Sequence, residues 1–411
     1  MPLKRYKPPR KYKIRRYGKI YRGSKRPPTY ERLRLVLGIV AVVVVAFVGW
    51  SVSGPVMDFL SGTLEAHEPV SSSVPMPSSS LPEPSVPEPE SEPEPVFVAP
   101  DFSQLHAAYL PPETVGNAMQ LAAALEELES ASVNAVLVDL KDASGQILYE
   151  SGLPQVEEIG AQAPDAWNLR ELSRTLSERG IALMGRMACF QDSIAASRID
   201  GAGVLYADAS YLWLDAEEEN GGQPWLDPYA PQTIDYLSSL AQEAAELGVH
   251  QLVLSECTYP TAYGRESAVF NSEDGGFHVE GLQDFLTAME TAVGDRCGLS
   301  LFVPGADALG LNNNRYGVEN PLALWDQVVL DLTPAGVQPA LDAYLISTGP
   351  QADMAVFLEA FQPAIQDYVT GQEFCILFQP EQEGEARQAQ LDALTEQYGD
   401  SWIFDSSQES A

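Results

Sequence analysis

The sequence predicts an α/β fold, a (β/α)8 TIM-like barrel in residues 96–411, preceded by one transmembrane helix and a disordered stalk. Two observations predict the barrel. From about residue 96, short apolar runs rich in β-branched and aromatic residues alternate with amphipathic segments of helical period. Eight such runs and seven intervening segments follow one another, and repeated strand–helix units require a parallel sheet covered by helices. Eight units are the number that closes such a barrel.

The expected strands cover residues 106–111, 135–141, 182–190, 250–257, 298–303, 342–348, 373–379 and 401–405. The expected helices cover residues 115–130, 168–179, 231–247, 279–293, 321–331, 352–368 and 384–398. Several helices end at a glycine stop signal, for example Gly180 and Gly248. An open doubly wound sheet is the alternative fold. It is less favoured because no glycine-rich phosphate loop follows the first strand.

A transmembrane helix is predicted over residues 35–57, which contain no charged residue. At 23 residues this stretch is long enough to span a hydrocarbon core of about 30 Å. Residues 1–34 hold 14 of the 24 Lys and Arg residues, so the positive-inside rule places this basic tail in the cytoplasm and residues 96–411 outside the cell. A cleaved signal peptide is the alternative, although its cleavage site would be poor.

Residues 58–95 form the expected stalk. Nine prolines lie between Pro69 and Pro95, separated mainly by Ser and Glu. Such a composition cannot build a core and favours an extended, disordered chain. At about 3.1 Å per residue, these 27 residues reach at most about 80 Å. The stalk is therefore expected to hold the barrel away from the membrane.

Charge separates the two parts of the chain. After residue 34 there are 57 Asp and Glu against 10 Lys and Arg, a net charge of −47. A domain this acidic repels nucleic acid and anionic membranes, so we expect neither as a partner of the barrel. The basic tail interleaves tyrosines with its charges. This pattern could bind nucleic acid, but topogenic charge lying on anionic lipid headgroups is the favoured interpretation.

Cysteine and histidine give little indication of metal or redox chemistry. The four cysteines form no C-x-x-C pair, and buried free thiols are the favoured expectation. Cys189 and Cys257, both at predicted strand ends, are the one pair for which a disulfide is worth testing. The four histidines show no metal-ligand spacing. We therefore expect neither a metal nor a cofactor.

Candidate site residues lie where the predicted strands end, because catalytic groups of such barrels occupy the carboxyl ends of strands. The second strand ends in Asp139, Lys141 and Asp142, and the third carries Arg186 followed by Asp192. Strand alternation places Asp139 and Lys141 on one face. Arg186 is expected to point inward and pair with Asp139, which is equally compatible with a structural ion pair between strands.

Further candidates come from the loop after the third strand and from later strand ends. These are Trp225, Asp227, Glu256, Tyr259, Asp307, Gln379 and Asp405. Aromatic rings and carboxylates at a barrel mouth suit sugar binding, since rings stack on C–H bonds and carboxylates accept hydroxyl hydrogen bonds. For Asp227 the alternative is a helix cap ahead of residues 231–247. Glu256 is the best-placed carboxylate of its strand, although alternation puts it off the face of Ser255.

The stretches AVLVDLKDASG, ALMGRMACFQD, WLDPY and ELGVHQLVLSECTYP resemble the bacterial putative glycoside hydrolase domain family, amylase-like barrels of unknown substrate. The resemblance covers roughly residues 105–405. It implies site roles at positions that match the family motifs: Asp139, Lys141, Asp142, Gly145, Arg186, Phe190, Asp192, Trp225, Asp227, Pro228 and Gln379. It also implies a TIM barrel acting on a glycan, here as a membrane-anchored member.

One departure from the family pattern concerns the fourth strand. Anchored on Pro260, the chain has Ser255 where the family has Asp and Thr258 where it has Arg. In amylase-like barrels that Asp is the usual nucleophile, and a serine cannot form the glycosyl intermediate of a retaining hydrolase. Glu256 could replace it only if the strand end is irregular.

Three functions follow from these residues. The first is hydrolysis of a cell-envelope or environmental polysaccharide, peptidoglycan included, with Asp139, Glu256 and Asp307 as catalytic candidates and Asp227 in reserve. The second is an inactive barrel that binds glycan or scaffolds envelope proteins. A metal-dependent hydrolase is the third, weakened by the scarcity of histidine.

Overall fold

The computed structural model describes residues 98–130, 133–207, 210–262, 264–308, 315–337, 372–379 and 385–405. The chain divides into two compact units, Met1–Glu90 and Ser91–Ala411, and all described residues belong to the second. The predicted tail, transmembrane helix and stalk lie wholly outside the described residues, as do the ranges 342–348 and 352–368. Across the described ranges, no helix has the length and apolarity needed to cross a membrane.

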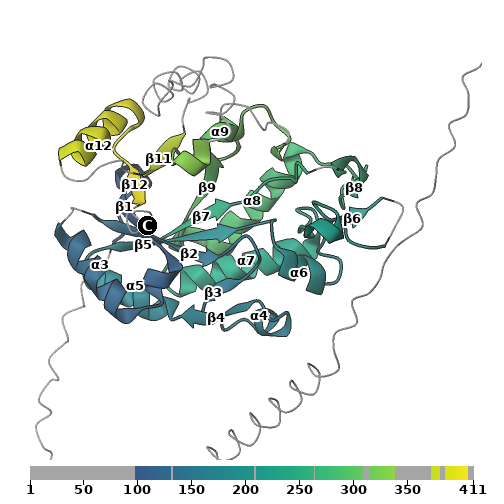
Figure 1. The fold of residues 1–411 in the computed structure, drawn as a ribbon, viewed down its shortest axis with the longest axis horizontal. Helices are drawn as coiled ribbons and strands as arrows, with labels where there is room; N and C mark the ends of the chain where they lie inside the picture. Colours follow the sequence, from purple (N-terminus) through teal and green to yellow (C-terminus); the bar gives the residue numbers. More distant parts are fainter. Residues whose placement is uncertain are drawn as a thin grey trace, which may run out of the picture. The chain divides into compact units, whose positions relative to one another are not determined.

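Eight parallel strands form a closed barrel in the second unit (Figure 1). In order around the barrel they are β1 (His106–Leu110), β2 (Ala135–Lys141), β5 (Ala182–Ala188), β7 (Gln251–Ser255), β9 (Gly298–Pro304), β10 (Gln327–Asp331), β11 (Glu373–Phe378) and β12 (Trp402–Asp405). Strand β1 pairs with both β2 and β12, which closes the sheet. All strands run in one direction, so their carboxyl ends share one end of the barrel, called here the mouth.

Helices cover the outside of the barrel (Figure 1). In the described ranges the α-helices are α2 (Pro112–Val115), α3 (Ala118–Ser130), α4 (Pro154–Glu158), α5 (Leu169–Ser177), α6 (Ser193–Arg198), α7 (Pro231–Glu246), α8 (Val279–Val293), α9 (Gly305–Ala308) and α12 (Glu385–Tyr398). The 3-10 helices are η1 (Phe102–Gln104), η2 (Glu218–Asn220), η3 (Arg265–Ser267), η4 (Gly294–Arg296) and η6 (Pro321–Leu324). Two short additions join the barrel: β3 (Ile147–Tyr149) with β4 (Gln162–Trp167), and the antiparallel pair β6 (Leu205–Tyr206) and β8 (Ala268–Val269).

Strand alternation divides the core into two regions. The interior of the barrel is filled by one set of buried side chains, which includes Leu137 of β2, Met184 of β5 and Val329 of β10. The intervening residues, such as Val136 and Val138, pack outward into the larger core beneath the helices. Because successive side chains of a strand point to opposite faces, the residues two positions beyond Leu137, Met184 and Val329 also point inward.

Most predicted elements are confirmed, and one segment is corrected. Seven of the eight predicted ranges contain a barrel strand, but the sixth strand is Gln327–Asp331, inside the range predicted as the helix 321–331. Only its first four residues are helical, as η6. The run Val328-Val329-Leu330 is fully buried and begins with two β-branched residues, and the barrel needs a strand between β9 and β11. Tertiary pairing therefore outweighs the helical spacing there.

The core between α8 and the barrel offers a test of this packing. Phe285 of α8 is fully buried and meets the Phe190 ring edge-on at 4.7 Å between centroids. We predict that Phe285→Ala lowers the free energy of unfolding by about 3–5 kcal/mol, because it leaves a cavity. Urea denaturation measures this value. Met119→Ala, at a side chain 80% exposed, is the control and should change it by less than about 0.5 kcal/mol. A loss below 1 kcal/mol at Phe285 would contradict the packing.

Candidate active site

Polar side chains replace apolar ones in the last inward-facing layer of the barrel, at the mouth. Alternation along the strands brings Tyr109, Asp139, Arg186, Ser255, Asp331 and Asp405 into this layer, each within two residues of the carboxyl end of its strand. Gln379 follows β11 by one residue and continues the same alternation. Five of eight strands therefore supply an ionisable group to one end of the barrel, which is the place where barrels of this type hold their active sites.

Arg186 lies at the centre of this layer and is paired with Asp139 on the neighbouring strand. Its Nε and Nη2 donate to Asp139 Oδ1 at 2.5 Å and Oδ2 at 3.0 Å, a two-point contact. The Tyr109 hydroxyl donates to the same Oδ2 at 2.8 Å. The Arg186 guanidinium also lies over the Tyr109 ring at 5.0 Å and the Phe302 ring at 5.6 Å. The expected pairing of Arg186 with Asp139 is thus present.

Burial and neighbouring charges shift the pKa values of Arg186 and Tyr109. Burial lowers the pKa of Arg186, but the Asp139 carboxylate more than offsets it, so the pKa is raised and the guanidinium stays charged. Burial, followed by the Asp139 charge, raises the pKa of the Tyr109 phenol. The phenol is therefore a fixed hydrogen-bond donor. Asp139 already accepts three hydrogen bonds from these two residues, which holds its carboxylate in place.

Asp331, at the end of β10, is a buried carboxyl group that the sequence reasoning missed. Its Oδ1 accepts hydrogen bonds from the Thr333 amide at 2.9 Å and hydroxyl at 2.6 Å. Burial raises the pKa of Asp331, and the nearby Asp405 charge adds to this effect, while Thr333 and the Arg186 charge oppose it. Asp331 thus takes up a proton more readily than an ordinary carboxyl group. The signal available in the sequence was the apolar run VVL directly before it.

A second group of charges lies after β7 and β9. Arg315 Nη2 is 3.0 Å from Glu256 Oε2, and Nη1 is 3.2 Å from Asp307 Oδ2. One guanidinium contacts both carboxylates, so their oxygens are at most about 9 Å apart, below the upper limit for paired glycosidase carboxylates. The Tyr316 hydroxyl donates to Asp307 at 3.0 Å. Two of the predicted catalytic residues, Glu256 and Asp307, are therefore brought together.

Glu256 has an unusual backbone. Its φ of +47° makes it the one residue other than glycine with a positive φ in the described part of the chain. Such a conformation is costly for a residue with a Cβ and persists only where the surroundings impose it. Strand β7 ends at Ser255, so the strand end is irregular at the position that matters. Alternation alone would have turned the Glu256 side chain away from the inward face.

Lys141 and Asp192 form a buried ion pair and do not line the mouth. A register shift after Asp139 displaces Lys141 from regular pairing with β5. The Lys141 ammonium lies 3.0 Å from Asp192 Oδ2 and donates to the Ala188 carbonyl at 2.7 Å. Asp192 Oδ1 accepts from the Ala195 amide and caps α6. The pair ties β2 to the beginning of α6, and with both side chains at most 2% exposed, neither is available to a substrate.

Two other predicted substrate-binding residues organise loops. Asp142 is a turn residue whose Oδ1 accepts from the amides of Ser144 at 2.9 Å and Gln146 at 2.8 Å. Trp225 is buried, and its indole donates to Asp215 at 3.1 Å. Both contacts lie within single loops and reach no other residue of the mouth.

Asp227 holds two loop segments together. Its Oδ1 accepts from the Tyr229 amide at 3.0 Å and its Oδ2 from the Asn271 amide at 2.7 Å. It is not the cap of α7, whose cap residue is Ala230. Burial raises the pKa of Asp227 to about 6, although both hydrogen bonds act in the opposite direction.

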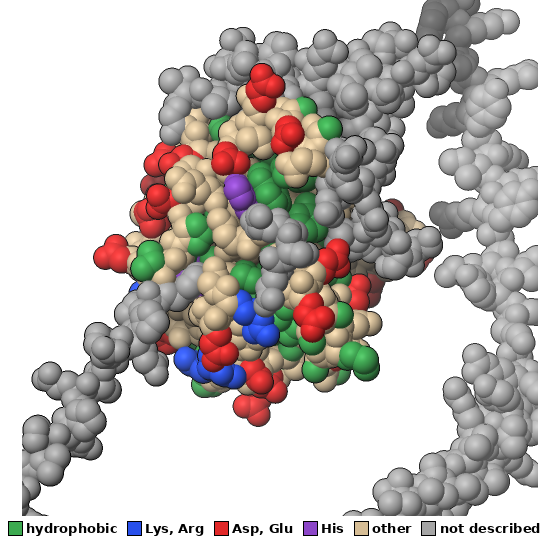
Figure 2. All heavy atoms as spheres, turned by 90° about the vertical axis from the view of Figure 1, so that its left-hand side faces the viewer, with side chains coloured by type: hydrophobic (Ala, Val, Ile, Leu, Met, Phe, Trp, Pro, Cys, Tyr) green, Lys and Arg blue, Asp and Glu red, His purple; other side chains and the backbone are tan. Residues whose placement is uncertain are grey.

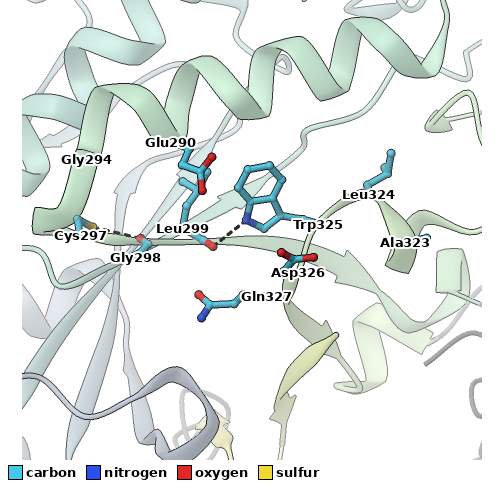
Figure 3. Close-up of a pocket in the computed structure, with 10 residues that line it drawn as sticks. All are labelled: Glu290, Gly294, Cys297, Gly298, Leu299, Ala323, Leu324, Trp325, Asp326 and Gln327. Carbon is cyan, nitrogen blue, oxygen red and sulfur yellow. Dashed lines mark hydrogen bonds between the residues drawn. The ribbon is translucent and has the colours of Figure 1, made fainter. Parts of the chain in front are cut away.

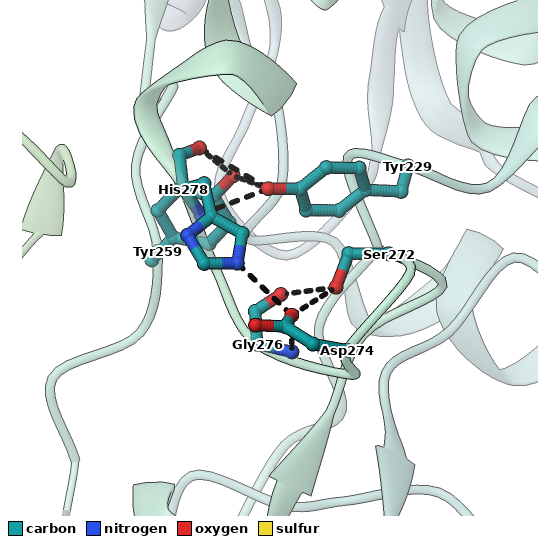
Figure 4. Close-up of polar contacts among 6 residues, drawn as sticks. All are labelled: Tyr229, Tyr259, Ser272, Asp274, Gly276 and His278. Carbon is teal, nitrogen blue, oxygen red and sulfur yellow. Dashed lines mark hydrogen bonds and ion pairs between the residues drawn. The ribbon is translucent and has the colours of Figure 1, made fainter.

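Tyr259 is the buried member of a hydrogen-bond network beside α8 that extends to exposed residues (Figure 4). Its hydroxyl donates to the His278 carbonyl at 2.8 Å and lies 3.1 Å from the Tyr229 hydroxyl. The His278 imidazole contacts Asp274 at 2.9 Å, a hydrogen bond that raises the pKa of His278 and lowers that of Asp274 to about 2. Tyr259 is fully buried among aromatic rings, so its role is structural.

The cysteines are free and buried, including Cys189 and Cys257. A hydrogen bond joins these two thiols, and burial raises the pKa of Cys257, so the Cys257 thiol stays protonated near neutral pH. Within the ranges the structure describes, no cluster of three or more His, Cys, Asp and Glu side chains is placed to hold a metal ion.

The fold and this site define a TIM-type barrel with its ionisable groups at the mouth. Residues 107–311 match the model of a family described as "putative glycosyl hydrolase domain". This part of the chain is therefore similar to a putative glycosyl hydrolase domain. No curated protein matches the chain.

Solved structures with a similar fold include several glycoside hydrolases. A hypothetical protein from Ruminiclostridium thermocellum is 29% identical over 47% of this chain and 96% of its own, with a TM-score of 0.42. An alpha-galactosidase from Thermus thermophilus is 14% identical over 74% of this chain and 58% of its own, with a TM-score of 0.43. The isomaltulose synthase of Protaminobacter rubrum is 10% identical over 75% of this chain and 65% of its own, with a TM-score of 0.46. This chain spans less than two thirds of the last two.

The buried ion pair gives one prediction. Lys141→Met leaves the Asp192 charge buried without its partner and should cost about 3–5 kcal/mol of unfolding free energy. The control is Arg174→Met, which removes a pair with Glu178 in which both side chains are more than half exposed and should cost at most about 1 kcal/mol. Chemical denaturation measures both variants. Equal losses would contradict the structural role of Lys141.

Asp227 gives a prediction about pH. Its folded-state pKa of about 6 lies above the ordinary 3.8, so the folded chain binds the proton more tightly than the unfolded chain. The resulting stability is present below about pH 4 and is lost as the pH rises through 6, a fall of roughly 2–3 kcal/mol. Denaturation midpoints between pH 4 and 7 measure it, and Asp227→Asn should flatten the dependence. If the stability of Asp227→Asn depends on pH as steeply as that of the wild-type protein, the raised pKa of Asp227 is contradicted.

Proposed function

We propose that the barrel hydrolyses a glycan at its mouth, with Asp331 as the proton donor and Glu256 as the partner carboxylate. Glycoside hydrolysis requires two carboxyl groups in different states: a protonated one for the leaving oxygen and an ionised one that acts as nucleophile or base. The observation that carries the proposal is this difference in environment. Burial favours the protonated form of Asp331, whereas Glu256 forms an ion pair with Arg315.

The irregular end of β7 supports a role for Glu256. Ser255 occupies the inward position where the family pattern has a carboxylate, and a hydroxyl group cannot carry out that function. The positive φ of the next residue offers a way to supply a carboxylate one position later. Backbone strain of this kind is concentrated at functional sites, where the surrounding structure maintains it. Arg315 Nη2 donates to the Glu256 carboxylate, and the same nitrogen donates to the Thr258 hydroxyl, which helps to hold Arg315 in place.

Arg186, Asp139 and Tyr109 would bind the sugar ring. Arg186 and Asp139 are 23% and 16% exposed, so both remain accessible from the mouth. A guanidinium and a carboxylate can together donate to and accept from neighbouring sugar hydroxyls, and their mutual contact fixes their orientation before the sugar arrives. Asp307 is 1% exposed, so we assign it to positioning Arg315 and not to the chemistry.

The substrate we propose is a cell-envelope or environmental polysaccharide, peptidoglycan glycan included. The acidic composition of the domain argues against a highly anionic polymer. On the face in Figure 2, acidic side chains are scattered widely and basic ones are confined to a small area.

We propose further that residues 35–57 anchor the chain in the cell membrane and that the stalk presents the barrel outside. The uncharged stretch behind a basic tail supports this topology.

A glycan-binding barrel without hydrolysis is the second candidate. Ser255 is the observation that favours it, because the loss of a carboxylate from the usual strand position is what a decayed hydrolase would show. The two candidates differ in one measurable property, turnover, while both require a glycan in the mouth.

Variants of the two carboxyl groups test hydrolysis. We predict that Glu256→Gln and Asp331→Asn each lower kcat by about 10²–10⁴-fold on any aryl glycoside or polysaccharide that the full-length protein cleaves, because each removes a group needed for proton transfer or covalent catalysis. Steady-state kinetics measure kcat, with Glu126→Gln on an exposed part of α3 as the matched control.

The outcome also separates the two candidates. A kcat close to the wild-type value in both Glu256→Gln and Asp331→Asn would contradict the assignment of Glu256 and Asp331 as catalytic residues. Binding without turnover, with hydrolysis gained in Ser255→Asp, would favour the decayed enzyme.

A further inference from the structure

A pocket of about 520 Å³ opens at the end of the barrel opposite the mouth (Figure 3). It lies between the last turn of α8 and the first residues of β9 and β10, which begin at Gly298 and Gln327. Strands of the barrel are parallel, so their amino ends are about one strand length from the mouth. The proposed catalytic groups do not line this pocket. Any ligand here would therefore occupy a site separate from the chemistry.

Trp325 provides an oriented aromatic surface in the pocket. Its indole N–H donates to the Leu299 carbonyl at 2.9 Å, which ties the ring to strand β9 (Figure 3). The side chain is only partly buried and packs on the main core. A ring fixed in this way can stack on an apolar ligand face without losing conformational freedom on binding.

Two carboxylates, Glu290 and Asp326, accompany the tryptophan. Neither makes a side-chain hydrogen bond or ion pair within the part of the chain the structure describes, and both are exposed. They leave four oxygens free to accept hydrogen bonds. The Gln327 amide, in contrast, is already used, since it accepts from Gln251 and donates to Glu373.

Among the described residues that line this pocket, none carries a positive charge. The remaining polar group is the Cys297 thiol, and burial raises its pKa to about 12, so it is uncharged. An anionic ligand would meet two carboxylates without a counter-charge and would be repelled. A ligand with one apolar face and several hydroxyl donors would satisfy both the ring and the carboxylates.

We propose that this pocket is a second, non-catalytic saccharide site, which binds a neutral sugar unit against Trp325 with Glu290 and Asp326 accepting its hydroxyl hydrogen bonds. The choice of a glycan as ligand rests on the proposed function, but the site does not depend on turnover. Its volume, within the 300–1,000 Å³ of small-ligand sites, accommodates one or two sugar rings. A polymer held here and at the mouth would gain avidity from two contacts on one domain.

Titration of the full-length protein in an uncharged detergent tests the site. The probes are the neutral hexasaccharides cellohexaose, maltohexaose and chitohexaose, with chitosan hexaose as a cationic comparison. The mouth is disabled by Glu256→Gln so that the probes stay intact. We expect at least one neutral hexasaccharide to bind, and the Trp325→Leu variant and the double variant Glu290→Gln/Asp326→Asn each to weaken its Kd by about fivefold or more.

The double variant keeps the inference testable if Trp325→Leu fails to fold, and Glu126→Gln is the control for a change in net charge. Unchanged affinity in the double variant, no binding of any neutral hexasaccharide, or binding of chitosan hexaose alone would each overturn the proposal. Kinetics on an aryl glycoside report on the mouth separately. Absence of turnover in the protein with Glu256 intact, together with hexasaccharide binding that depends on Trp325, would therefore count against the proposed function and not against this site.

Discussion

The Arg186–Asp139 contact is the interaction on which the organisation of the mouth depends. A guanidinium inside a barrel is costly unless its charge is balanced and its donors are used. Asp139 on the adjacent strand supplies both, and Tyr109 completes the carboxylate's hydrogen bonds. With this pair in place, the last inward layer is polar while the layer beneath it stays apolar. The boundary between a packed core and a polar mouth is thus set by two neighbouring strands.

The positive charge of Arg186 also affects another carboxyl group of the mouth, that of Asp331. The Arg186 charge lowers the pKa of Asp331, but burial outweighs it, so the group still favours its protonated form. Glu256 and Asp307 have their own cation in Arg315. The mouth therefore contains carboxyl groups in unlike surroundings, which is how one fold provides both an acid and a base near neutral pH. The strained backbone of Glu256 fits this picture, because the ion pair with Arg315 is one of the contacts that hold it.

Much of the fold could be predicted from periodicity, and much less of the site. Alternation along β2 and β5 was enough to pair Asp139 with Arg186, because both residues lie within regular strands. Asp331 could not be found while 321–331 was taken for a helix, since helical and buried-strand spacing are hard to distinguish over short apolar runs. Arg315 gives no local signal at all: it meets Glu256 across 59 positions of the chain.

Other predicted site residues have suitable side chains, but the structure places these side chains in contacts with the rest of the chain. Lys141 and Asp192 are polar groups near strand ends, and Asp227 lies in the loop after the third strand, as a site requires. The structure uses them to satisfy buried charges and loop amides. Sequence identifies residue types at strand ends, but whether a carboxylate faces solvent or another segment depends on tertiary contacts that periodicity does not contain.

The central claim is that a glycan is bound and cleaved between Glu256 and Asp331. The most direct measurement is a crystal structure of the Glu256→Gln protein with a neutral oligosaccharide. The account predicts a sugar ring against Arg186 and Tyr109, with the glycosidic oxygen within hydrogen-bond distance of Asp331. A sugar bound in the mouth but out of reach of Asp331 and residue 256, or no sugar in the mouth at all, would contradict it.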